Sequence, residues 1–192
     1  MSVQSETKCR IVMLGIGAVG KSAISIQFVQ GRFVLDYDPT IASNYSRTAK
    51  IDNNTVNIEI FDTAGMETFN SVMNSTIRNG DAFIIIYDIT DKSSFDNVIN
   101  YHNEVIQAKN ADKVPCVLCG NKCDLSDNRQ VAKADGEKLA KSMNAIFFET
   151  SAKTNTNVFQ AFESAVKQIW EVRNGKKNSD SGNKKKGLCN IL

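Results

Sequence analysis

The segment Gly15 to Ser22, with the sequence GIGAVGKS, has residue types and a spacing that suit the binding of a phosphate group. It follows the strand-like run CRIVML and opens the helical pattern SAISIQFV, the context that a phosphate-binding loop requires. The glycines let successive backbone N–H groups point at phosphate oxygens, and the helix N-terminus adds partial positive charge. In such a loop Lys21 contacts the β- and γ-phosphates, and the Ser22 hydroxyl binds Mg²⁺. A chance match has odds on the order of one in a hundred, so we predict a phosphate loop.

Two polar segments further along the chain indicate which nucleotide carries that phosphate. Asn121-Lys122-Cys123-Asp124 follows the apolar run VPCVLCG, and Ser151-Ala152-Lys153 follows NAIFFET. An aspartate carboxylate can accept hydrogen bonds from both the ring N1–H and the exocyclic amine of guanine. Adenine presents the opposite pattern and would leave the carboxylate unpaired. Each segment alone could be a solvated turn, but together and in this order they predict binding of a guanine nucleotide.

The elements that must position these segments alternate between strands and helices. Five runs rich in β-branched and aromatic residues are typical of strands: CRIVMLG, TVNIEIF, AFIIIYDI, VPCVLCG and NAIFFET. SRTAKI precedes the turn Asp52-Asn53-Asn54 and is expected to pair with TVNIEIF as an antiparallel hairpin. From Val158 to Val172, apolar residues recur at helical spacing. This alternation predicts a mostly parallel sheet with helices on both faces, and such folds bind ligands at the carboxyl ends of their strands.

Together these motifs resemble those of the Ras-family small GTPases. The resemblance covers nearly the whole chain, Lys8 to Leu192, through GIGAVGKS, FVLDYDPTI, DTAG, NKCD, ETSAK and the ending CNIL. It implies an α/β P-loop small G domain, with a six-stranded, mostly parallel sheet flanked by five helices. It also implies GDP and GTP as ligands, Mg²⁺ as cofactor, and a GTPase reaction that converts GTP and water to GDP and phosphate.

The resemblance assigns nucleotide contacts residue by residue. Phe33 would lie over the guanine ring, while Lys122 would pack along the base. Asn121 and Asp124 would read guanine, and the Ala152 N–H would contact its carbonyl oxygen. The nucleotide-binding set that the resemblance implies is Gly15, Gly17, Ala18, Val19, Gly20, Lys21, Ser22, Ala23, Phe33, Tyr37, Thr40, Asp62, Gly65, Asn121, Lys122, Asp124, Ser151, Ala152 and Lys153.

By the same resemblance, two segments would sense the terminal phosphate. Ser22 and Thr40 would bind Mg²⁺, Asp62 would hold the metal through water, and Tyr37 would close over the phosphates. Thr40 and the Gly65 N–H would also contact the γ-phosphate. Loss of that phosphate removes both contacts, so each loop relaxes. The resemblance therefore implies a switch between two surfaces, read by guanine nucleotide exchange factors, GTPase-activating proteins and effectors.

The implied effector region departs from its Ras and Rap relatives. It comprises Tyr37, Asp38, Pro39, Thr40, Ile41, Ala42, Ser43, Asn44 and Tyr45. Those relatives carry an acidic pair where this chain has Ala42 and Ser43. Effectors that approach with a basic strand would lose that attraction, and charge complementarity governs both partner choice and on-rate. Neutral variation of the surface is the alternative interpretation.

Met66, in DTAGMETFN, stands where the family has a glutamine that orients the attacking water. A thioether is a weak acceptor and offers no donor, although Met66 could also serve as a packing residue. The implied catalytic set is Lys21, Thr40, Gly65 and Met66. Gly17 leaves room for an arginine finger, and some Rap-type relatives without the glutamine are served by activators that provide their own side chain. We expect a switch with slow intrinsic hydrolysis; the alternative is a persistently GTP-bound binding module with negligible hydrolysis.

Composition indicates one globular domain with a basic end. The chain has 192 residues, of which 42% are hydrophobic and 23% charged, and its net charge is +2. Residues 176–192 carry +4, which leaves −2 for residues 1–175. A basic tail on a slightly acidic body favours an anionic membrane surface over nucleic acid. We expect a short extension at 1–7, a G domain at 8–173 and a flexible polybasic tail at 174–192, with neither a signal peptide nor a membrane span.

The ending Cys189-Asn190-Ile191-Leu192 fits the C-a-a-X prenylation pattern, except that Asn190 is polar. Its terminal leucine favours a geranylgeranyl group on Cys189. One lipid chain alone gives marginal anchoring. The lysines at 184–186 supply a second signal, worth roughly 1 kcal/mol each near an anionic leaflet. We expect the cytoplasmic face of the plasma membrane or of another membrane, the alternative being a merely solvated polar terminus.

Two features are best explained by packing. Cys116, Cys119 and Cys123 superficially resemble a metal site. Side chains alternate along a strand, so Cys116 and Cys119 should point to opposite faces, which favours packed, reduced thiols. His102 lies at helical spacing from Val98 and Val105, which favours a neutral packing role over a catalytic one.

Overall fold

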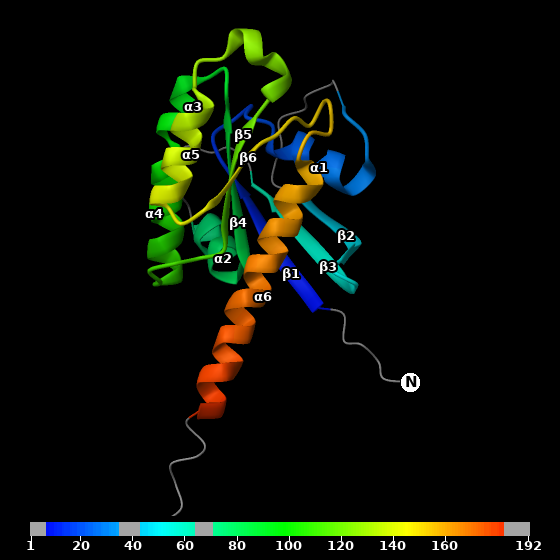
Figure 1. Cartoon of the computed structure of the whole chain (residues 1–192), viewed down its shortest axis with the longest axis vertical. Helices are drawn as coiled ribbons and strands as arrows, with labels where there is room; N and C mark the ends of the chain where they lie inside the picture. Colours follow the sequence, from blue (N-terminus) through cyan, green and yellow to red (C-terminus); the bar gives the residue numbers. More distant parts are fainter. Residues whose placement is uncertain (1–6, 35–42, 64–70, 183–192) are drawn as a thin grey trace, which may run out of the picture.

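The computed structural model describes residues 7–34, 43–63 and 71–182, and a six-stranded sheet forms its centre (Figure 1). Its strands are β1 (Thr7–Leu14), β2 (Ser43–Ile51), β3 (Asn54–Asp62), β4 (Ala82–Asp88), β5 (Cys116–Asn121) and β6 (Ile146–Glu149). The spatial order is β2-β3-β1-β4-β5-β6, with β2 antiparallel to β3 and the other neighbours parallel. The predicted α/β P-loop architecture is therefore confirmed.

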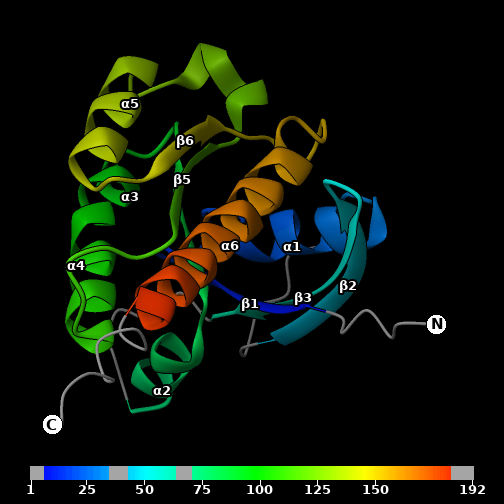
Figure 2. The same cartoon turned by 60° about the horizontal axis from the view of Figure 1, so that its bottom comes forward.

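Helices cover both faces of this sheet. They are α1 (Lys21–Gln30), α2 (Ser71–Asn79), α3 (Lys92–Asp96), α4 (Val98–Lys109), α5 (Lys133–Ser142) and α6 (Val158–Gly182), with a 3₁₀ segment at Cys123–Asn128. Helices α1 and α6 pack on one face, and α2, α4 and α5 pack on the other. Figure 2 shows α6 lying across its face of the sheet beside α1.

Alternation along the strands divides the core into two layers. In β1, Cys9, Ile11 and Met13 face α1 and α6, whereas Val12 and Leu14 face the opposite helices. The central strands β4 and β5 are buried along their whole length, because a strand covered on both faces needs apolar residues at every position. Within the part of the chain described here, no helix is both long and apolar enough to cross a membrane.

The expected hairpin is confirmed. β2 and β3 pair from Ser43↔Asp62 to Ile51↔Asn54. Asp52 and Asn53 form the two-residue turn, both with positive φ (44° and 65°), as a turn matched to the twist of its strands requires.

Cys116 and Cys119 point to opposite faces of β5, as predicted from alternation. Cys119 joins the layer under α1 and α6, and Cys116 joins the other. Burial raises the pKa of the Cys116 thiol to about 12. Burial also lowers the pKa of His102, opposed by a hydrogen bond with the Met143 backbone, as suits a neutral packing residue.

Two sequence-based boundaries differ from the structure. We expected five helices, but the described residues hold six, since α3 and α4 are separate and Asn97 is the cap residue of both. The flexible tail was expected from Asn174, yet α6 continues to Gly182. Extension of an existing helix gains one hydrogen bond for each residue fixed, which offsets much of the polar segment's loss of freedom.

Candidate functional site

The loop between β1 and α1 is formed around two glycines that allow close approach. At Gly15 (φ +140°) a Cβ would lie 2.3 Å from the Ile86 carbonyl oxygen. At Gly20 (φ +98°) it would lie 2.3 Å from the Asn121 amide nitrogen. Each has both a left-handed backbone and no room for a side chain. The loop therefore lies directly against the carboxyl ends of β4 and β5.

Lys21 begins α1 and turns its side chain back over this loop. Its Nζ donates hydrogen bonds of 2.8 Å to the carbonyl oxygens of Gly15 and Ile16, and the residue is 6% exposed. Burial lowers the pKa of Lys21 to about 8, although the nearby Asp62 carboxylate raises it. A phosphate group would favour the ammonium form further, so the loop holds a cation ready for an anionic ligand.

Asp62 ends β3 close to Lys21 and is 1% exposed. Among the described residues, neither of its carboxylate oxygens has a hydrogen-bond partner of ordinary geometry. Burial raises the pKa of Asp62, opposed by the Ser22 hydroxyl and the Lys21 ammonium. Because the net direction is upward, Lys21 and Ser22 do not fully offset the cost of burying this carboxylate, and a further cation would stabilise it. The oxygens of Asp62 and Ser22 are ligands that Mg²⁺ prefers, so the donor set fits that ion.

The side chain of Asn121 fastens the loop to the end of β5. Its Nδ2 donates to the Val19 carbonyl oxygen at 2.8 Å, and its Oδ1 accepts a hydrogen bond from the Thr150 hydroxyl at 3.3 Å. Although Asn121 lines the cavity, its amide thus joins the phosphate loop to the neighbouring strand ends. The amide nitrogen has a second N–H donor, so the predicted contact of Asn121 with guanine stays a prediction.

Asp124 is oriented by the loop that follows β6. The Ser151 hydroxyl donates to Asp124 Oδ1 at 2.6 Å, while the Ser151 oxygen accepts from the Thr154 N–H at 3.1 Å. An ionised carboxylate has about four acceptor positions. The Ser151 bond therefore fixes the carboxylate and still leaves capacity for two N–H groups of a base.

The side chain of Lys122 is held by a residue at the end of β4. Its Nζ lies 2.6 Å from Asp88 Oδ2 at the end of β4, and Asp88 Oδ1 accepts from the N–H and hydroxyl of Thr90 at 2.8 and 2.7 Å. With its charged end paired, the aliphatic stem of Lys122 lines the cavity. This arrangement suits the expected packing of Lys122 along a flat base.

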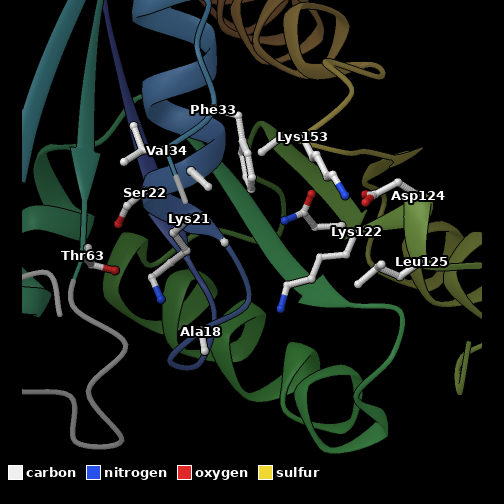
Figure 3. Close-up of a pocket in the computed structure, with 14 residues that line it drawn as sticks. Ala18, Lys21, Ser22, Phe33, Val34, Thr63, Lys122, Asp124, Leu125 and Lys153 are labelled. Carbon is white, nitrogen blue, oxygen red and sulfur yellow. The ribbon is translucent and has the colours of Figure 1, made fainter. Parts of the chain in front are cut away.

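These groups surround a cavity of about 460 Å³, within the range of small-ligand sites. Figure 3 shows Phe33 on the side opposite Lys122, with Asp124 and Lys153 at one end and Lys21 and Ser22 toward the other. The lining residues are Ala18, Gly20, Lys21, Ser22, Ala23, Phe33, Val34, Thr63, Asn121, Lys122, Asp124, Leu125, Ala152 and Lys153.

Eleven of the sequence-predicted residues line this cavity, and the other described ones lie around it. Gly15 and Val19 are buried in the loop, and Gly17 is exposed on it. Ser151 contacts the lining residue Asp124, and Asp62 adjoins the lining residues Lys21 and Ser22. Tyr37, Thr40, Gly65 and Met66 lie outside the described residues, as do Asp38, Pro39, Ile41 and Ala42, so their roles stay predictions. Ser43, Asn44 and Tyr45 begin the edge strand β2.

Sequence reasoning missed three lining residues: Val34, Thr63 and Leu125. Each directly follows a residue that was predicted, Phe33, Asp62 or Asp124. Thr63 also donates from its hydroxyl to the Met13 carbonyl oxygen at 2.7 Å, which fixes the segment after β3 against β1. Adjacency to a motif was therefore the available signal.

Comparison with known proteins identifies the family of this chain. The sequence pattern of the Ras family matches residues 10–171. The chain belongs to the Ras family. Ras-like protein rasB of Dictyostelium discoideum is 41% identical over 199 residues, covering 100% of both chains. Ras-like protein rasS of the same organism is 40% identical over 190 residues, covering 95% of this chain and 98% of that protein. Ras-like protein 2 of Mucor circinelloides f. lusitanicus is 41% identical over 185 residues, covering 95% and 93%.

Membership of the Ras family establishes the general activity of this chain. As a Ras-family small GTPase, the chain binds GDP and GTP, hydrolyses GTP and acts as a switch. Members generally interact with exchange factors, GTPase-activating proteins and effectors. In this chain, Asp124, which is hydrogen-bonded to Ser151, lies at one end of the cavity, and Lys21 lies toward the other.

Proposed function

We propose that this protein is a membrane-tethered GDP/GTP switch in signal transduction whose intrinsic GTP hydrolysis is slow. The observation that carries the nucleotide part is the cavity itself, which has a fixed acceptor at one end and a buried ammonium at the other. The acceptor complements guanine, and the ammonium complements phosphate. The tether and the slow rate rest on features of the sequence.

Slow hydrolysis follows from Met66. Hydrolysis needs a water molecule held in line with the γ-phosphate, and the family uses a glutamine amide for this. A thioether cannot donate a hydrogen bond to hold that water. Lys21 would still stabilise charge on the phosphates, but charge stabilisation without a positioned nucleophile lowers the barrier only in part.

Mg²⁺ is the proposed cofactor, with Ser22, Thr40 and Asp62 as the residues that would hold it. The bound ion would neutralise charge on the phosphate oxygens. The poorly paired, buried carboxylate of Asp62 and the adjoining Ser22 support this assignment. Thr40 joins the set through the family resemblance, as does Gly65 through its backbone N–H.

The proposed effector surface is the segment Tyr37 to Tyr45, which ends on β2. Ser43 lies opposite Asp62 in the β2–β3 ladder, so a partner on this edge would lie next to the phosphate end of the site. Since Ala42 and Ser43 carry no charge, we propose effectors with a less basic contact surface than those that Ras and Rap relatives attract.

The tether proposed is a geranylgeranyl group on Cys189 together with Lys184, Lys185 and Lys186. Two signals of this kind convert marginal lipid binding into stable anchoring. The proposed location is the cytoplasmic face of the plasma membrane or of another membrane.

A second candidate is a GTP-bound binding module whose hydrolysis is negligible, and Met66 is the observation that favours it. It shares every nucleotide contact with the switch. The two functions differ in the nucleotide that the protein carries in the cell.

Identification of the nucleotide bound to protein purified from its own cells tests the proposal. A switch should carry guanine nucleotides alone, with GDP a substantial share, and Met66→Gln should carry a larger share of GDP. Nearly pure GTP in the wild-type protein would favour the binding module. Adenine nucleotides in the site would contradict both functions.

A further inference from the structure

Arg47 connects the edge strand β2 to the end of helix α1. It lies half-buried near the middle of β2, opposite Ile58 of β3. Its Nη1 donates a hydrogen bond to the Phe28 carbonyl oxygen, and its guanidinium carbon lies 4.9 Å from the centroid of the Phe28 ring. One side chain thus contacts both the backbone and the ring of the same helical residue.

The position that Arg47 contacts is the last turn of α1. Carbonyl groups in a last turn lack partners within the helix, and a cation there interacts favourably with the helix dipole. The last turn of α1 contains no basic residue of its own. Arg47 therefore places a cation, from a neighbouring strand, on a backbone carbonyl of this last turn, whereas Arg32, just after the helix, contacts the Gln30 side chain.

Phe28 is also held in place by aromatic side chains of α6. It is 2% exposed, and its ring stacks on Phe162 of α6 with a centroid distance of 3.9 Å and an interplanar angle of 24°. A second ring of α6, Phe159, lies 6.1 Å away. Arg47, Phe28 and α6 together form a rigid support for the end of α1.

The end of α1 leads directly into the wall of the nucleotide cavity. Gly31 closes the helix in the left-handed conformation (φ 66°), and its N–H donates to the Gln27 carbonyl oxygen at 3.0 Å. Phe33 and Val34 follow and line the cavity, each 38% exposed. Exposed side chains receive little support from packing, so their position depends on where and how α1 ends.

We propose that Arg47 is a positioning residue for nucleotide retention: it holds the last turn of α1 and thereby keeps Phe33 over the base. The inference rests on the guanine-nucleotide binding described above and adds to it a residue outside the cavity. Arg47 is two residues from Tyr45, the last residue of the proposed effector region, so its contacts with Phe28 also join that strand to the end of α1.

The test is the dissociation rate of a fluorescent GDP analogue from full-length protein with excess Mg²⁺ and unlabelled GDP. Arg47→Gln should release the analogue about three to ten times faster, since it loses a charge-assisted hydrogen bond and a cation–π contact. Arg47→Lys should fall between Gln and wild type. Lys50→Gln is the matched control, because Lys50 is an exposed cation on the same strand. This variant should release the analogue at the wild-type rate.

A double-mutant cycle with Phe33→Leu separates positioning from general weakening. If Arg47 acts through Phe33, Arg47→Gln should add less than about twofold once Phe33 is already replaced. The same factor in both backgrounds, or no effect of Arg47→Gln on the release rate, would overturn the inference even if the thermal unfolding midpoint fell. A wild-type protein that does not retain GDP would instead overturn the proposed function.

Discussion

Asp124 illustrates how a single side chain depends on partners from a distant part of the chain. Its carboxylate is held by the Ser151 hydroxyl, and Ser151 is oriented by the Thr154 N–H. The sequence motifs placed both residues at the base, but the direct bond between them follows from the pairing of β5 with β6. The neighbouring Asn121 shows the opposite case, since no motif spacing indicated that its amide would hold the Val19 carbonyl.

Replacement of Asp124 tests base recognition. Asp124→Asn should weaken GDP binding on the order of 10- to 100-fold, because an amide cannot accept from both guanine N–H groups. Preference should shift toward xanthine nucleotides, which can accept the hydrogen bond that the amide donates. Displacement titrations with GTP, XTP and ATP measure this preference.

Asp127→Asn is the control for that experiment, because Asp127 is exposed on the same 3₁₀ segment. It should leave nucleotide preference unchanged. Equal competition by ATP and GTP for the wild-type protein would refute the assignment of Asp124.

At the scale of secondary structure elements, Gln168 joins α6 to the sheet. Its Oε1 accepts from the Cys116 N–H and its Nε2 donates to the Cys116 carbonyl oxygen, both at 3.1 Å. β6 pairs with β5 only from Val117 onward. The Gln168 side chain therefore makes hydrogen bonds with the Cys116 backbone at a position where β5 has no β6 partner.

Removal of this amide should cost stability without changing nucleotide choice. Gln168→Ala should lower the free energy of unfolding by about 1–3 kcal/mol, since it leaves two partly buried backbone groups without their partner. Gln160→Ala, at an exposed position of α6, should change it by less than about 0.5 kcal/mol. Urea unfolding of the GDP-bound protein measures both, and equal values would contradict the role given to Gln168.

Local sequence patterns predicted most elements, but long-range packing decided the rest. Alternation in β1 and β5 and the turn at Asp52-Asn53 follow from side-chain period and turn chemistry, so they were predictable. The glycine at position 136, inside α5, was not predictable, because the side chains that require it belong to distant parts of the sequence. A Cβ there would come within 2.5 Å of the Tyr87 hydroxyl and 2.6 Å of the Phe147 ring. The split at Asn97 and the length of α6 likewise depend on context that a spacing rule does not contain.

For the molecule as a whole, the nucleotide cavity and the chain leading to the tail lie at opposite ends of the sheet. The cavity lies at the carboxyl ends of β1, β3, β5 and β6. Near the other end, Arg173 of α6 donates to the Lys8 carbonyl oxygen at 3.0 Å and pairs with Asp81 at 3.3 Å. Figure 1 shows α6 continuing beyond the sheet in this direction. The proposed tether would therefore leave the nucleotide cavity directed away from the membrane attachment point.

The tail can be tested apart from the nucleotide site. Cys189→Ser should move the protein from the membrane fraction to the soluble fraction of its cells, because it removes the only proposed lipid attachment. Replacement of Lys184, Lys185 and Lys186 with Gln should leave association that is weaker and more sensitive to salt, since about 3 kcal/mol of electrostatic attraction is lost. Membrane association of the Cys189→Ser protein at the wild-type level would contradict the tether.

The central claim is that GTP hydrolysis is slow because Met66 cannot hold the attacking water. Single-turnover hydrolysis of GTP by the wild-type and Met66→Gln proteins, without an activating protein, tests it most directly. The wild-type rate should be at or below the ~10⁻⁴ s⁻¹ scale of glutamine-bearing relatives. Met66→Gln should be faster with nearly unchanged GTP affinity, because the glutamine acts mainly in the transition state. Equal rates for the two proteins would contradict the account and assign the positioning of water to another group.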